Sequence, residues 1–288
     1  MARRRAALAL ALAALLSDPG SARGQAPAEN APASEAPQGP THNPPGMNAL
    51  VGREATIYWD DAKSLFFAPF HWNGAQIRTA VGAGALVGGV MIFDDRLAQD
   101  AQNHASAATN QMSKIVTPFG SWAAYAVSAA LIVSGVAVHE SRITSMGREG
   151  IEACLMAGLM TDILKPVFGR ERPEVSGNRT VYKPFSGNDS FPSGHATVAF
   201  ALASVVSARS SGWVIPTASY TLASLVAYSR VNDAKHFPSD VVAGGLIGAA
   251  VGRFIVHRHE RAASGAAPPK VEISLYPVHN GLGVAARF

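Results

Sequence analysis

The stretch NDSFPSGHATVAFALASVV, residues 188–206, places a compact polar turn directly before a long apolar run. Residues 196–208 contain neither proline nor charge, which predicts a buried helix. Ser193 is the expected N-cap of this helix. The first N–H groups of a helix have no partner inside it and attract anions, and Gly194 would let an anion approach the backbone closely. His195, in the first helical turn, would add a titratable proton at the same place.

Six apolar stretches of this kind follow one another along the chain, and each is rich in alanine, glycine and serine. They cover residues 77–93, 122–138, 151–164, 196–208, 213–228 and 241–256. Their lengths suit helices and none alternates as a strand would, so the sequence predicts an all-α, six-helix bundle. Gly244, Gly248 and Gly252 recur at a spacing that would let another helix approach the last stretch closely.

Composition argues against several classes of protein. The chain has 288 residues, of which 48% are hydrophobic, so it can bury one sizeable core. Its net charge is +4, but the basic residues are scattered apart from residues 3–5, which argues against nucleic-acid binding. Cys154 is the single cysteine, so neither an internal disulfide nor a thiolate metal site is expected. No pattern indicates an oligomeric state.

The two ends of the chain differ from its apolar middle. Residues 1–26 begin with three arginines at positions 3–5, followed by a short apolar stretch and small residues, as a secretory signal peptide does. Residues 27–46 are rich in proline and alanine and predict a disordered linker. The main domain would then cover residues 47–262. Residues 263–288 would form a tail, in which the alternation around Asn280-Gly281 predicts a short β-hairpin.

Chemically reactive residues gather in three connections between the apolar stretches, within KPVFGRERP, FPSGH and SRVNDAKHFPSD. These blocks hold Lys165 and Arg172-Pro173; Pro192-Ser193-Gly194-His195; and Ser229-Arg230, His236 and Asp240. In residue type, order and spacing they resemble the type 2 phosphatidic acid phosphatase (PAP2) superfamily, which also includes class A acid phosphatases and vanadium haloperoxidases. The resemblance covers residues 151–256.

This resemblance implies a metal-independent phosphatase that passes through a phosphohistidine. His236 would be the nucleophile, Asp240 would keep its other ring nitrogen protonated, and His195 would be the general acid and later the base. Pro238 favours a helix start, which would bring Asp240 within one turn of His236. The phosphate oxygens would be bound by Lys165, Arg172, Ser193, Gly194 and Arg230. Cationic side chains would replace a metal, no cofactor is expected, and vanadate should inhibit.

Two other functions would use the same anion-binding residues. A vanadate-dependent haloperoxidase would hold vanadate there and take peroxide as a substrate, and a non-catalytic envelope protein would only bind phosphate. A phosphatase would hydrolyse phosphate monoesters or pyrophosphates, and its substrate would be a lipid phosphate or a soluble phosphate ester. Three other polar groups are interpreted as helix caps and surface: Trp59-Asp60-Asp61, Asp94-Asp95-Arg96 and His104.

The apolar stretches also bear on the location of the protein. They are about 13 to 17 residues long, whereas a membrane span needs about 20. In an exported chain whose amino terminus is outside, three and five crossings would leave the motifs in the cytoplasm, an unexpected side for such a phosphatase. The sequence therefore favours an exported periplasmic enzyme with possible membrane association, and an integral inner-membrane protein is the alternative.

Overall fold

The computed structural model describes residues 47–176, 179–265, 272–278 and 281–287. The predicted signal peptide and linker lie outside these ranges. In chain order the elements are α2 (Met47–Phe67), the 3-10 helix η2 (Ala68–His71), α3 (Gly74–Ile92), α4 (Asp94–Asn103), α5 (Ala107–Val116), the 3-10 helix η3 (Thr117–Gly120), α6 (Trp122–Ala137), α7 (Ser141–Phe168), α8 (Pro173–Ser176), α9 (Gly194–Arg209), α10 (Val214–Asn232), α11 (Pro238–Ala263), β1 (Glu272–Val278) and β2 (Gly281–Arg287).

The described residues are mostly helical, as the sequence predicted. The six predicted stretches correspond to α3, α6, α7, α9, α10 and α11, but α2, α4, α5 and α8 also occur in the described part of the chain. The count of six was therefore too low. Helices α4 and α5 were not predicted because these short helices are polar on one side and contain no continuous apolar run.

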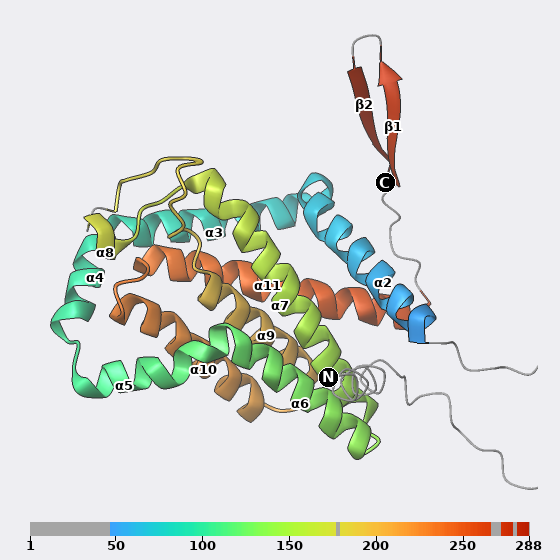
Figure 1. Ribbon diagram of the computed structural model, residues 1–288, viewed down its shortest axis with the longest axis horizontal. Helices are drawn as coiled ribbons and strands as arrows, with labels where there is room; N and C mark the ends of the chain where they lie inside the picture. Colours follow the sequence, from blue (N-terminus) through green and yellow to red (C-terminus); the bar gives the residue numbers. More distant parts are fainter. Residues whose placement is uncertain (1–46, 177–178, 266–271, 279–280, 288) are drawn as a thin grey trace, which may run out of the picture.

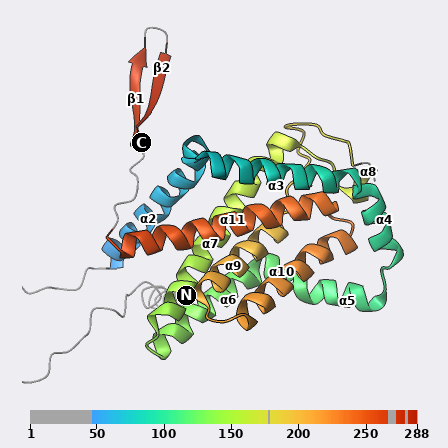
Figure 2. The same ribbon diagram turned by 180° about the vertical axis from the view of Figure 1, so that it is seen from behind.

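Helix α9 lies in the middle of the bundle (Figure 1 and Figure 2). It packs against α7, α10 and α11, and small buried residues line these contacts. A methyl group at Gly248 of α11 would overlap the backbone carbonyl of Thr197 in α9, and Gly244 and Gly252 meet α9 as closely. The predicted close approach at the glycine row is therefore confirmed, and it fixes the start of α11 against the start of α9.

Local signals define where the helices that carry the motifs begin and end. Helix α7 ends at Gly169, which has a φ of 55° and leaves no room for a Cβ beside the carbonyl of Lys183. Pro238 is the first residue of α11, as predicted. Because these ends are fixed, the residues directly before and after them have defined positions in the bundle.

Two helices of the described chain are long and apolar enough to cross a bilayer, α3 with 19 residues and α11 with 26. The segment α5–η3 and helix α6, which meet at 58°, pass the same test as a broken span. No residue of α3 is buried, and Ile77, Val81 and Ile92 are at least half exposed. The predicted span lengths were too short because they counted only the apolar runs. The exposed apolar helix α3 favours the integral-membrane alternative.

Two strands occupy the predicted carboxyl-terminal tail. β1 and β2 pair antiparallel, with Glu272 opposite Arg287 and Val278 opposite Gly281. Residues 279–280, where a turn was predicted, lie outside the described residues.

Candidate active site

One end of the bundle brings together the end of α7, the start of α9, the end of α10 and the start of α11. Figure 1 and Figure 2 show these helix ends near α8. All three motifs lie on these ends or in the adjoining loops. The predicted site residues found there are Lys165, Arg172, Ser193, Gly194, His195, Arg230, His236 and Asp240.

The buried ring of His236 is oriented by one short hydrogen bond. Its Nδ1 lies 2.7 Å from the backbone carbonyl oxygen of Ser190. A carbonyl oxygen can only accept, so Nδ1 carries the proton in the neutral ring and Nε2 keeps a lone pair. His236 thus has the tautomer that a nucleophilic ring nitrogen requires.

Asp240 does not contact His236 in the predicted way. Its Oδ2 lies 3.8 Å from Nδ1 of His236, which is too long for a hydrogen bond. Instead the carboxylate accepts from Arg170 at 2.5 Å, from the Ser190 hydroxyl at 2.6 Å and from the Phe237 N–H at 2.8 Å. Ser190 connects the two residues, since its carbonyl accepts from His236 and its hydroxyl donates to Asp240.

Arg170 is completely buried and joins Asp240 to Asp94. Its Nη1 lies 2.5 Å from Asp240 Oδ1, and its Nη2 lies 2.7 Å from Asp94 Oδ2. Burial alone would lower the pKa of Arg170, but Asp240 and Asp94 outweigh this and raise it. The interpretation of Asp94 as a surface cap is therefore wrong. Its side chain is fully buried because Arg170 and Ser239 satisfy its oxygens.

Positive charge surrounds His195 at the start of α9. The Nζ of Lys165 lies 3.8 Å from the place that a Cβ on Gly194 would occupy. The pKa of His195 is lowered to about 4, first by removal from water and then by nearby basic groups. These groups are Arg230, His236, Lys165 and Arg172. His195 is therefore neutral near pH 7, and an anion that offset these charges would raise its pKa.

The guanidinium group of Arg172 is held by Asp189. Its Nε and Nη2 donate to the two oxygens of Asp189 at 2.7 and 2.6 Å. Burial would raise the pKa of Asp189, but Arg172 lowers it overall. The sequence predicted that this fork binds phosphate. Both nitrogens of this fork instead donate to Asp189. The remaining nitrogen, Nη1, lies 3.8 Å from Glu174 and is the one that could donate to an anion.

Nε of Arg170 has no hydrogen-bond partner, and two of the predicted phosphate-binding side chains also have a buried donor without a partner. These two donors are the hydroxyl of Ser193 and Nε of Arg230, whose Nη1 donates to Thr117 at 3.2 Å and to Asp233 at 3.3 Å. Ser193 stands at the predicted N-cap position of α9, but its side chain makes no capping hydrogen bond. Buried donors are normally paired, so unpaired donors beside several cations indicate a place for an anion.

Sequence reasoning missed three residues that contact the motif residues: Arg170, Asp189 and Ser190. Arg170 lies inside the first motif, and the other two directly precede the second. Their position within or beside a motif was the one signal that could have marked these three residues as part of the site. Residue type gave no further help, because arginine, aspartate and serine are also common in exposed loops.

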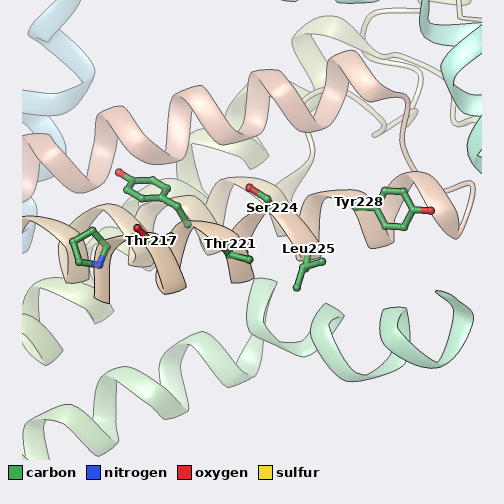
Figure 3. Close-up of a pocket in the computed structure, with 7 residues that line it drawn as sticks. Thr217, Thr221, Ser224, Leu225 and Tyr228 are labelled. Atoms are coloured by element: carbon green, nitrogen blue, oxygen red, sulfur yellow. The ribbon is translucent and has the colours of Figure 1, made fainter. Parts of the chain in front are cut away.

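A hollow on α10 lies outside this cluster. Its lining residues are Pro216, Thr217, Tyr220, Thr221, Ser224, Leu225 and Tyr228. Figure 3 shows them along one helix, and none of the predicted site residues is among them. The candidate active site is therefore defined by the convergence of polar side chains at the end of the bundle and not by this hollow.

Comparison with known families agrees with the motifs. Residues 151–263 match the profile of the PAP2 superfamily. Over these residues the chain is similar to the PAP2 superfamily. The matched PAP2 region contains all three motifs and the helices α9, α10 and α11 that position them.

Several known proteins are similar to this chain. A lipid A 1-phosphatase of Rhizobium johnstonii is 28% identical over 204 residues, which cover 63% of this chain and 78% of the relative. A lipid A 1-phosphatase of Porphyromonas gingivalis is 32% identical over 122 residues, covering 40% of this chain and 24% of the relative. The profile match and these relatives support the predicted enzyme class, a phosphoric ester hydrolase.

Two solved structures are also similar. Aquifex aeolicus LpxE is 20% identical with a TM-score of 0.42, covering 56% of this chain and 93% of that one. A transmembrane PAP2-type phosphatidylglycerolphosphate phosphatase of Bacillus subtilis is 17% identical with a TM-score of 0.46, covering 73% of this chain and 96% of that one.

Proposed function

We propose that the chain is a metal-independent PAP2 phosphatase that removes a phosphate group from a lipid phosphate or lipid pyrophosphate through a phosphohistidine intermediate. The relatives named lipid A 1-phosphatase support a lipid as the substrate. The exposed apolar helix α3 supports the same choice, because a protein in the membrane meets lipid phosphates directly. A soluble phosphate ester is the second candidate substrate.

One observation carries the proposal: buried donors without partners lie beside a histidine with an available lone pair. The unpaired Ser193 hydroxyl and Arg230 Nε would bind phosphate oxygens. The Gly194 N–H at the start of α9 and the Lys165 ammonium group would bind others. His236 Nε2 would then attack the phosphorus, since Nδ1 is engaged by Ser190.

In the proposed reaction, a bond forms from His236 Nε2 to phosphorus and the bond from phosphorus to the leaving oxygen breaks. His195 donates a proton to that oxygen. Water then attacks the phosphorus while the bond from phosphorus to Nε2 breaks, His195 accepts a proton from this water, and inorganic phosphate leaves. Asp240 lies close enough to His236, at 3.8 Å, for its charge to stabilise the cationic phosphorylated ring. Arg170 and Ser190 would keep that carboxylate in place.

The proton that His195 donates would come from the substrate. His195 has a pKa of about 4 without an anion, so it is neutral at the pH where a phosphate ester is a monoanion. Binding the monoanion would transfer its proton to His195, because the anion offsets the surrounding positive charge. Productive binding thus requires neutral His195 and a protonated phosphate ester together.

The domain limits predicted from the sequence, residues 1–26, 27–46, 47–262 and 263–288, remain predictions, and so does export of the chain. We place the enzyme in the inner membrane, with α3 and α11 as spans. If the chain is exported, the active site should lie on the periplasmic side of this membrane.

The purified full chain in detergent should release inorganic phosphate from lipid A and phosphatidic acid faster than from soluble sugar phosphates. Initial rates should not change when a chelator is added, and vanadate should inhibit. With vanadate, peroxide and bromide, no oxidised halide should form. Halide oxidation would favour the haloperoxidase, and the absence of any phosphate release would favour a non-catalytic phosphate-binding protein.

The proposed role of His195 predicts a specific pH profile. For an alkyl phosphate, kcat/KM should be highest between about pH 4 and pH 6. It should fall below about 4 as His195 takes up a proton before substrate binds, and above about 6 as the ester loses its second proton. In the His195→Ala variant, the fall of kcat/KM below about pH 4 should disappear.

The same variant separates the general-acid role from a structural one. His195→Ala should lose at least about 100-fold with an alkyl phosphate and much less with nitrophenyl phosphate, whose leaving group needs little protonation. Equal losses on the two substrates would show that His195 is not the proton donor.

A further inference from the structure

Three side chains from three helices meet at the other end of the bundle. They are Asp61 of α2, Glu152 of α7 and His259 of α11. Figure 1 shows α2 beside the carboxyl-terminal part of α11, whereas Asp240 lies near the opposite end of that helix. At 1.5 Å per residue, His259 is roughly 28 Å along α11 from Asp240. This cluster is therefore separate from the candidate active site.

The cluster is buried and compact. Asp61 is 3% exposed and Glu152 is 0% exposed, so the interpretation of Asp61 as surface is wrong. His259 Nε2 lies 3.0 Å from Glu152 Oε2 and 3.3 Å from Asp61 Oδ2. Ligands bound at about 2.0–2.1 Å around a tetrahedral ion lie about 3.3 Å from one another. The two distances from His259 are close to this value, and all three ligand atoms lie within 4.8 Å of one another.

Glu152 gives the second, independent indication of a ligand. Neither of its buried carboxylate oxygens accepts a hydrogen bond of good geometry. A buried carboxylate without a hydrogen bond is costly, and buried charges are normally hydrogen-bonded or bound to a metal. The group that Glu152 faces, His259 Nε2, is a common metal ligand when the ring is neutral.

The groups that contact His259 and Asp61 from outside the cluster also fit a metal site. His259 Nδ1 lies 3.5 Å from Glu149 Oε1, and Glu149 is held by Arg209 at 2.6 and 2.7 Å. The other oxygen of Asp61 accepts from Arg258. Histidines that bind a metal commonly donate their second N–H to a carboxylate, which fixes the ring and its tautomer.

A cavity of about 160 Å³ adjoins the cluster and is lined partly by Glu149, Glu152 and His259. It has room for water, which occupies about 30 Å³ per molecule in the liquid. We propose that Asp61, Glu152 and His259 bind one divalent first-row transition ion such as Zn²⁺ or Mn²⁺, with water from this cavity completing the coordination. One imidazole and two carboxylates suit these ions. The ion would fasten α2 to α7 and α11 and would take no part in phosphate hydrolysis.

The test uses the full chain, purified in detergent and freed of metal with a chelator. Equilibrium dialysis against ZnCl₂ or MnCl₂, followed by elemental analysis, should give one ion per chain, and the bound ion should raise the Tm. Glu152→Gln should weaken binding at least about 100-fold. His257→Gln should not change it, because His257 lies on the same helix but is exposed and outside the cluster.

A second variant keeps the test decisive if Glu152→Gln does not fold. Glu149→Gln leaves the three ligands in place and should weaken binding about 10- to 100-fold by removing the carboxylate behind His259. Failure of the wild-type chain to bind either ion more tightly than about 1 mM would overturn the proposal. So would unchanged binding in folded Glu152→Gln. His259 would then be a protonated partner of the surrounding carboxylates. Neither measurement depends on phosphatase activity.

Discussion

The His236→Ala variant should hydrolyse its phosphate substrate at least about 1,000-fold more slowly than the wild-type chain. The loss should fall on kcat more than on KM, because Lys165 and Arg230 would still bind phosphate while the attacking nitrogen is gone. Initial rates on a lipid phosphate in detergent micelles measure this effect. The thermal unfolding midpoint shows whether the fold survives removal of the buried ring.

The matched control is His104→Ala. His104 is exposed at the end of α4, where its Nδ1 contacts the carbonyl of Asp100 at 2.7 Å. Its activity should stay within about two-fold of wild type, since an exposed helix-end contact contributes little. A folded His236→Ala variant that kept more than a tenth of wild-type kcat would exclude His236 as the nucleophile.

Replacing Arg170 by methionine should destabilise the protein by about 3–5 kcal/mol, because two buried carboxylates would lose their shared cation. Arg170, Asp94 and Asp240 have fully buried side chains, so water cannot replace the lost contacts without a structural change. Activity should fall as well, since Arg170 holds the carboxylate that lies beside His236. Unfolding of the detergent-purified chain, followed by circular dichroism, measures the loss of stability.

Arg179→Met provides a control that removes a neighbouring ion pair of the same chemistry. Arg179 pairs with Asp95, and both side chains are about a third exposed, at 33% and 36%. Its loss should cost at most about 1 kcal/mol. Adding Asp94→Asn to Arg170→Met should restore part of the stability, because one unpaired buried charge is then removed. Equal destabilisation by Arg170→Met and Arg179→Met would contradict the buried network.

The sequence predicted the parts of the site that depend on local signals. The start of α9 after Ser193, the start of α11 at Pro238 and the close approach at Gly248 could all be read from residues within one helix or its ends. These features suffice to bring the three motifs to one end of a bundle. The motif spacing then identified which side chains to expect there.

Contacts between distant segments could not be predicted in this way. The burial of Asp94 depends on Arg170, 76 residues later, and on the fold of the whole bundle. The acceptor of His236 is a backbone carbonyl, that of Ser190, which no residue type reveals. The lengths of the membrane spans were underestimated for a related reason, since helices such as α11 continue beyond the apolar run from which they were predicted.

The most direct test of the account is to trap the phosphorylated enzyme. Wild-type chain is mixed briefly with substrate labelled at phosphorus and quenched in denaturing alkali, in which phosphohistidine survives. Label should appear on the protein within the first turnover and map to the peptide that contains His236, and the His236→Ala chain should carry none. Turnover without label on the wild-type protein at any time point, or label on another residue, would contradict a phosphohistidine at His236.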